Sequence, residues 1–370
     1  MIADDSAELF PTVLACIDAL VEEAPKLLDL QVQANLAGAC LSTIPRMAEL
    51  RRLSLLSNGM RDIRFFHSLS VLEHLKSLAI TFEESAAVTN SLSPQVSAPR
   101  ALPALTDLDV SVSPQQIAPL LSIFKDHPLE RLEIRTAIRP FSLDGPRLPD
   151  VTPDPSLWIK ALQDLPVRFP HLKHLTVGYH YYGGRRVDMT APGQFNLFEP
   201  LLELHELESI HLDFPWLFFT DSEFQKVASS WPELSSIRFA GSIGTPTATI
   251  AALQSFAIHC PKLQGISLPF DARQLPPTTV EDAPVSFSRV KTLDTQESPV
   301  ESALSVARHI DRIFPNIKTI QSSRNGDLWG EVGDLIRVLK AVRMDQKARD
   351  FALMKRVRSA RRNTVDNTLN

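Results

Sequence analysis

The sequence predicts an α/β solenoid in which a curved parallel sheet lines one face and helices cover the other. Eleven times along the 370 residues, an aliphatic residue is followed three positions later by a second one. A third position follows two residues after that, and it is aliphatic or aromatic in all copies except the last two. The first residues of successive copies lie 23 to 43 residues apart, which brackets the leucine-rich-repeat period. These observations predict a leucine-rich-repeat arc of the ribonuclease-inhibitor-like kind.

Each copy is expected to contain one short strand. The second and third positions of a copy are two residues apart, so their side chains point to the same side of a strand and their neighbours point to the other. One face of every strand is therefore buried and one is exposed. The first residues of the eleven copies are Leu27, Leu50, Leu75, Leu105, Leu129, Leu172, Leu207, Leu234, Leu263, Val290 and Ile317.

Amphipathic segments precede most of the later copies and predict helices. Their apolar residues recur at spacings of three and four, and the segments stop at Pro232, Pro261 and Pro315. Proline lacks the amide that a continuing helix uses, so each helix should end there. A single strand and helix cannot bury an apolar face alone, so the units must stack on one another. We therefore expect a solenoid of about eleven units over residues 1–325.

Residues 326–370 are expected to form a C-terminal capping helix followed by a basic tail. The first half of this helix has Val332, Leu335, Ile336, Leu339 and Val342 available to dock on the last repeat. Residues 337–362 hold ten Lys or Arg against two Asp, a net charge of +8, whereas the whole chain is −5, so the remainder carries −13. The run KRVRSARR is compatible with a nuclear import signal, with a contact to an acidic partner, or with an ordinary solvated helix end.

Bulk properties are typical of an intracellular protein. The three cysteines, Cys16, Cys40 and Cys260, are scattered and odd in number, so they predict neither a disulfide framework nor a zinc site and are expected to fill core positions. The sequence shows no signal segment, no apolar run of membrane-spanning length and no N-glycosylation acceptor. We expect the protein in the cytoplasm or the nucleus.

A loop on the rim of the arc is one candidate for partner contact. All three tyrosines, Tyr179, Tyr181 and Tyr182, lie with Arg185 and Arg186 directly after the strand expected to end at Val177. Tyrosine and arginine dominate binding hot spots. One repeat later the run DFPWLFFTD follows the next strand, and its Trp216 would join the patch. The opposing interpretation, which we favour for Phe214, Leu217 and Phe218, is that the apolar members pack under the following helix.

The concave face is the second candidate surface. The outward positions of the strands form a small, mixed polar lining with no single sign of charge, so nucleic acid is not indicated. The members expected to contact a protein partner are Asp107, Asp109, Arg131, His174, His211 and Arg238.

No catalytic, cofactor or metal site is predicted. His171, His174 and His180 are close in sequence, but no carboxylate or cysteine accompanies them at the spacing of metal ligands. Gly-rich nucleotide-binding motifs are absent, which also argues against a doubly wound sheet. Ser242 in the run GSIG lacks the nucleophile-elbow pattern. The sequence therefore predicts a protein that is not an enzyme.

The run from Phe198 through Trp231, Pro232 and Leu234, followed by Cys260, Pro261 and Leu263, resembles the repeat region of F-box proteins of mushroom-forming fungi. The resemblance covers most of residues 10–325. It implies the substrate receptor of an SCF-type ubiquitin ligase, in which the repeats hold the substrate. The chain departs from that family before the repeats, because only the segment up to Ala24 precedes the first copy and no F-box is recognisable there.

That departure leaves two interpretations of function. The first is a substrate-receptor-like module whose link to a Skp-type adaptor and a cullin requires an F-box supplied elsewhere. The second is a free-standing leucine-rich-repeat adaptor or regulator, related to a small GTPase or to nuclear transport, with no ligase link. Either way the expected partner is a protein, with no membrane and no nucleic acid involved.

Overall fold

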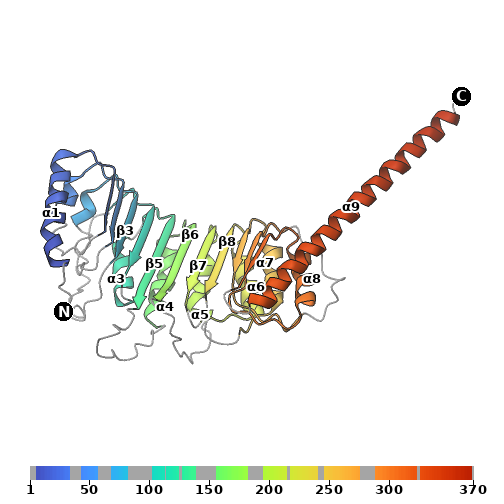
Figure 1. The fold of residues 1–370 in the computed structure, drawn as a ribbon. Coiled ribbons are helices and arrows are strands. Elements are labelled where there is room, and N and C mark those ends of the chain that lie inside the picture. Colours follow the sequence, from blue (N-terminus) through green and yellow to red (C-terminus); the bar gives the residue numbers. More distant parts are fainter. Residues whose placement is uncertain are drawn as a thin grey trace.

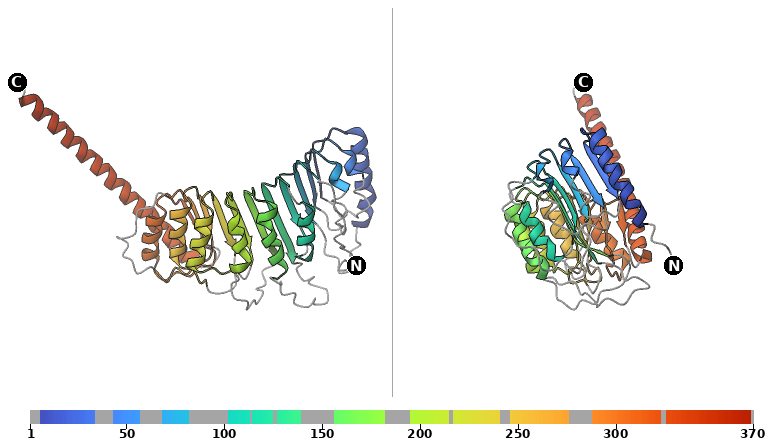
Figure 2. Two further views of the ribbon diagram at one scale, coloured as in Figure 1. Left: turned by 180° about the vertical axis from the view of Figure 1, so that it is seen from behind. Right: turned by 90° about the vertical axis from the view of Figure 1, so that its left-hand side faces the viewer.

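The computed structural model describes residues 6–33, 43–56, 68–81, 102–112, 114–124, 127–138, 156–181, 195–214, 217–240, 246–275, 288–322 and 326–368. Its centre is a single sheet of eleven parallel strands, arranged in space in the same order as in the sequence (Figure 1). Helices lie along one side of this sheet and leave the other side open (Figure 2). The predicted leucine-rich-repeat solenoid is confirmed.

Each predicted copy supplies one strand. The strands are β1 (Asp29–Gln33), β2 (Arg52–Leu56), β3 (Ser77–Thr81), β4 (Asp107–Ser111), β5 (Arg131–Ile138), β6 (His174–Tyr181), β7 (Ser209–Asp213), β8 (Ser236–Ala240), β9 (Gly265–Ser267), β10 (Thr292–Asp294) and β11 (Thr319–Gln321). The helical elements are α1 (Ser6–Glu23), η2 (Ile44–Arg46), η3 (Leu69–Val71), α3 (Pro114–Ile123), α4 (Ser156–Arg168), α5 (Phe195–Phe198), η4 (Glu199–Glu203), α6 (Asp221–Ser230), α7 (Ile250–His259), α8 (Ala303–Ile313) and α9 (Gly326–Thr368).

Equivalent residues of neighbouring repeats stack in register. Leu53 pairs with Leu78 on the next strand, which in turn pairs with Leu108, and the same register continues to Leu293. These side chains are at most 2% exposed, so they form a continuous row in the core. Because each row member touches the row members on both sides, every repeat needs its neighbours to bury its apolar face.

Helix α6 shows how the sequence sets the limits of one convex element. It starts at a capping box, in which the Thr220 hydroxyl accepts a hydrogen bond from the Glu223 amide and the Glu223 carboxylate accepts one from the Thr220 amide. It buries Phe224, Val227 and Ala228 and ends just before Pro232, as predicted. A cap of this type is worth about 1 kcal/mol of stability.

Helix α9 has a docked half and a projecting half. Trp329, Val332 and Ile336 are at most 3% exposed, and the Trp329 indole N–H donates to the Ser298 carbonyl oxygen at 2.9 Å. The Arg343 guanidinium pairs with the Asp311 carboxylate of α8. Beyond this point the helix leaves the body (Figure 1), and every side chain from Met344 to Arg356 is exposed. The expectation that Val342 docks is wrong, because its side chain is 62% exposed.

Two of the cysteines lie in described parts of the chain, and they differ in their surroundings. Cys260 is buried, as expected, and burial raises the pKa of its thiol to about 12. The expectation that Cys16 fills a core position is wrong, since its side chain is exposed on α1 while Ile17 and Val21 face the core. Cys40 lies outside the described residues.

Candidate protein-interaction surface

The open face of the sheet brings distant residues into three rows. Because the strands pair in register, the outward residues of β4 to β8 lie side by side across the sheet. We call these residues the central concave patch. Its first row is Asp107, Arg131, His174, Ser209 and Ser236; its second is Asp109, Glu133, Thr176, His211 and Arg238; its third is Ser111, Arg135, Gly178, Asp213 and Ala240. The six concave residues singled out from the sequence therefore share one surface.

On β4 and β5, most of the charged side chains of the central concave patch pair with one another. Arg131 donates from Nε to the Asp107 carboxylate at 3.0 Å, and Arg135 pairs with Glu133 on the same strand. Burial raises the pKa of the Asp109 carboxyl, and the positive charge of Arg135 opposes this effect. Exposed ion pairs contribute about 0–1 kcal/mol each, so these pairs set the pattern of charge more than the stability.

The two patch histidines are neutral at pH 7. Burial lowers the pKa of His174, and the nearby Arg131 lowers it further. Burial also lowers the pKa of His211 to about 4, with additional lowering by Arg238 and Arg135. The Nε2 atom of His211 is buried, and it has no hydrogen-bond partner among the residues that the structure describes.

We predict that His211 makes the protein less stable in mild acid. Because the pKa of folded His211 is about 4 and an unfolded histidine titrates near pH 6.5, the unfolded chain binds more protons between these values. Stability is therefore highest above about pH 6.5 and falls as the pH falls towards 4. At pH 5 the loss from this residue would be about 2 kcal/mol for a fully buried ring, and we expect about 1 kcal/mol because the ring is only half-buried.

The measurement is the urea midpoint at pH 7.5 and pH 5.0 for the wild type and for His211→Gln. The variant should lose less stability on acidification, while the exposed His171→Gln control should behave as the wild type does. Equal acid sensitivity in the wild type and His211→Gln would contradict the assignment.

The rim segment after β6 differs from the sequence-based expectation. The strand does not end at Val177 but continues to Tyr181. Tyr179 lies inside, with 2% exposure, and its hydroxyl accepts a hydrogen bond from the Trp158 indole N–H at 2.8 Å. The expectation that Tyr179 contacts a partner is therefore corrected: it is a core residue. The signal was present in the sequence, because Tyr179 continues the inward alternation of Leu175 and Val177.

Replacing Tyr179 by Phe should cost about 1–3 kcal/mol, because the buried Trp158 N–H would lose its partner while the ring packing remains. Chemical denaturation monitored by tryptophan fluorescence tests this. Tyr179→Phe with unchanged stability would show that the indole N–H finds another partner.

The other members of the predicted rim loop stay predictions. Tyr181 is in β6, and its side chain is not described. Tyr182, Arg185, Arg186 and Trp216 lie outside the described residues.

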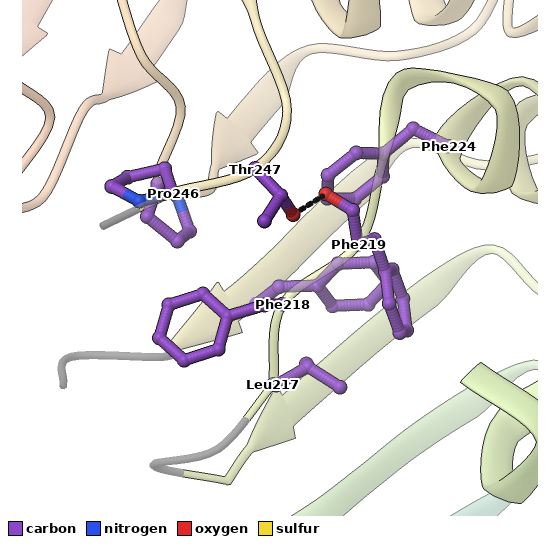
Figure 3. Close-up of a pocket in the computed structure, with 8 residues that line it drawn as sticks. Leu217, Phe218, Phe219, Phe224, Pro246 and Thr247 are labelled. Carbon is purple, nitrogen blue, oxygen red and sulfur yellow. Dashed lines mark hydrogen bonds between the residues drawn. The ribbon is translucent and has the colours of Figure 1, made fainter. Parts of the chain in front are cut away.

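The aromatic residues after β7 mostly pack inside, which is the interpretation that the sequence favoured. Phe214, Leu217 and Phe219 are at most 4% exposed. Phe218 is half-buried and faces a shallow apolar depression with Pro246, Phe219 and Phe224 around it (Figure 3). The depression offers about 220 Å³, open solvent included, which is below the roughly 300–1,000 Å³ of typical small-molecule sites. It is therefore too small for a drug-sized ligand.

The described residues contain neither a metal-binding cluster nor a helix that could span a membrane. Within the described ranges, no group of three or more His, Cys, Asp and Glu side chains is arranged to hold a metal ion. His171 instead faces the Glu206 carboxylate, with Nδ1 and Oε1 3.2 Å apart. Among the helices in the described part of the chain, none combines the length and the apolar character needed to cross a membrane.

Strand order and register place the chain in the leucine-rich-repeat solenoid class of folds. No family model and no curated protein matches the sequence. Among solved structures, an internalin of Listeria monocytogenes is similar at 16% identity and a TM-score of 0.40, over 82% of this chain and 70% of the internalin. The yeast Rad7 and Elc1 complex is similar at 13% identity and a TM-score of 0.42, over 85% of each chain.

The Drosophila Toll and Spatzle complex is similar at 13% identity and a TM-score of 0.42, over 85% of this chain and 36% of that chain. At this level of similarity, the assignment of the fold depends on the chain's own repeats and sheet.

Proposed function

We propose that the protein is a non-enzymatic module that binds a protein partner across its concave face. The observation that supports this most is the row arrangement of polar side chains on neighbouring strands of one open sheet. Strands of five residues are about 16 Å long, and eleven strands span about 48 Å. The face thus projects at most roughly 800 Å², which is what one partner contributes to a standard protein interface.

The charge pattern supports a folded or peptide partner better than a polyanion. Arg131 and Arg135 are already paired with Asp107 and Glu133 of the same face, and Asp109 adds a further carboxyl group beside them. A nucleic acid would meet these carboxylates, whereas a protein can present complementary groups of both signs.

The finer proposal is a substrate-receptor-like role in an F-box-type ubiquitin ligase. Its support is the resemblance of the repeat region to fungal F-box proteins. In this role the concave face holds the substrate, while a Skp-type adaptor and a cullin would join through an F-box that this sequence does not show.

The test is capture of partners by the tagged protein from its own cells, with quantitative mass spectrometry. Two matched variants place one bulky neutral residue on opposite faces: Ser236→Tyr on the concave side and Gln225→Tyr on α6, both at exposed positions. We expect some captured proteins to be recovered less well with Ser236→Tyr but equally well with Gln225→Tyr, and these proteins are partners of the concave face. Equal recovery with both variants would contradict it. A Skp-type adaptor and a cullin in the captured set would support the ligase role, and their absence would favour the free-standing adaptor.

A further inference from the structure

Arg238 stands apart from the other arginines of the concave face. Arg52 donates to Asp29 at 2.8 Å, and Arg131 and Arg135 pair with Asp107 and Glu133. Arg238 is exposed, and within the described residues no carboxylate or other acceptor pairs with its guanidinium. Arg52, Arg131 and Arg135 therefore each have a carboxylate partner on the same or the neighbouring strand, whereas Arg238 on β8 has none among the described residues.

His211 lies next to this arginine. The two residues pair in register on β7 and β8, so their outward side chains are neighbours in the second row. Within the described part of the chain, the buried Nε2 atom of His211 has no hydrogen-bond partner. The charged groups that shift the pKa of His211 are Arg238 and Arg135, with no carboxylate among them. The nearest acid along β7, Asp213, is engaged in an interaction of its own.

The surroundings add neutral hydroxyl groups instead of negative charge. Thr176 flanks His211 on β6, while Ser209 and Ser236 lie in the first row beside it. On the far side of Arg238, Ser267 donates to the Asp294 carboxylate at 2.9 Å, and the Gln296 amide donates to the same carboxylate at 3.0 Å, so this acid is already occupied. Among the described residues, the exposed Arg238 guanidinium therefore has no negative group to pair with, and the Nε2 atom of the neighbouring His211 ring is buried.

We propose that the Arg238 guanidinium, beside the ring of His211, forms a carboxylate subsite that receives an Asp or Glu side chain of the protein partner. Arginine binds a carboxylate through two parallel N–H donors, a geometry that also fixes orientation. The neutral His211 ring beside Arg238 adds no charge that would compete for the guanidinium. A single carboxylate matches this one guanidinium better than a phosphate, whose larger charge calls for an arginine cluster. The subsite rests on the proposed function, because it specifies what the concave face selects in its partner.

The experiment is selection of phage-displayed random twelve-residue peptides on the full chain. The wild type is compared with Arg238→Glu and with the matched control Arg52→Glu, which reverses an exposed arginine at the other end of the same face. Folding of each variant is checked by thermal melting. We expect the wild type to select peptides rich in Asp and Glu, and Arg238→Glu to bind them about 10- to 100-fold more weakly. Arg52→Glu should change binding less than about twofold.

The possible outcomes separate the subsite from the proposed function. The subsite would be overturned if acidic peptides bound Arg238→Glu as tightly as they bind the wild type. It would also be overturned if the selected peptides bound the concave face but were not rich in Asp and Glu. Both results would leave the proposed function standing. Selected peptides whose binding is unchanged by Ser236→Tyr, or the failure to select any peptide, would count against both the subsite and the proposed function. In a further comparison, phosphoserine replaces the Glu of a selected peptide. If the phosphoserine peptide bound tenfold more tightly, the subsite would be a phosphate site and the carboxylate proposal would be overturned.

Discussion

Replacing Trp329 by Ala is expected to lower the free energy of unfolding by about 3–5 kcal/mol, the range for truncating a buried aromatic residue. Its ring is 2% exposed, its N–H donates to Ser298, and it meets Phe270 edge to face with centroids 5.8 Å apart. The substitution also removes the anchor that holds α9 over the last repeat. Because terminal caps protect the core of a repeat array from water, the loss should reach the neighbouring repeats.

Urea unfolding followed by circular dichroism measures this loss. The matched control is Phe351→Ala on the projecting half of the same helix, where the ring is 74% exposed. The control should stay within about 0.5 kcal/mol of the wild type. An equal loss in both variants would mean that the projecting half is packed in solution, and no loss in Trp329→Ala would contradict the capping role of α9.

The second large effect is expected for Gly178→Ala in β6. A β-carbon at this position would collide with the Asp213 carbonyl oxygen and would lie 2.6 Å from the Asp213 β-carbon. Gly178 and Asp213 pair in register, so the strands can approach closely here only without a side chain. The backbone of β6 or β7 has to move, and we expect a loss of about 2–3 kcal/mol.

Gly265→Ala is the control for this prediction, because it makes the same change on the same face. Its β-carbon would lie 3.1 Å from the Thr292 hydroxyl, which can rotate away. We expect its stability to change by less than about 1 kcal/mol, since the strained contact is offset by the reduced entropy of the unfolded chain. Similar thermal midpoints for the two variants would contradict the close approach at Gly178.

Much of the fold was predictable because its signals are local. The alternation of two apolar positions in every copy located all eleven strands, and the prolines at 232, 261 and 315 marked the ends of α6, α7 and α8. The boundary of the docked part of α9 was not predictable in this way. Val342 continues the apolar pattern of the helix but is exposed, although the next residue, Arg343, still pairs with Asp311 of α8. A helical pattern alone does not show which residues of the face a neighbouring element covers.

The candidate site was predictable in its members but not in its pairing. Period-two alternation placed Asp107, Arg131, His211 and Arg238 on one face without any structure. Which arginine is neutralised depends on the register between strands and on side-chain conformations, neither of which a sequence pattern reports. Only the register shows that Arg131 meets Asp107 while Arg238 meets His211.

The central claim is that the concave face binds the partner, and cross-linking from a single position tests it most directly. A photoreactive benzoylphenylalanine at position 236 faces the concave side, and the same residue at position 225 faces outward from α6. After irradiation in cells, we expect one or more discrete protein adducts from position 236 and none of these from position 225. Adducts of the same partner from position 225, with position 236 silent, would show that the helical side is the binding surface and would contradict the claim.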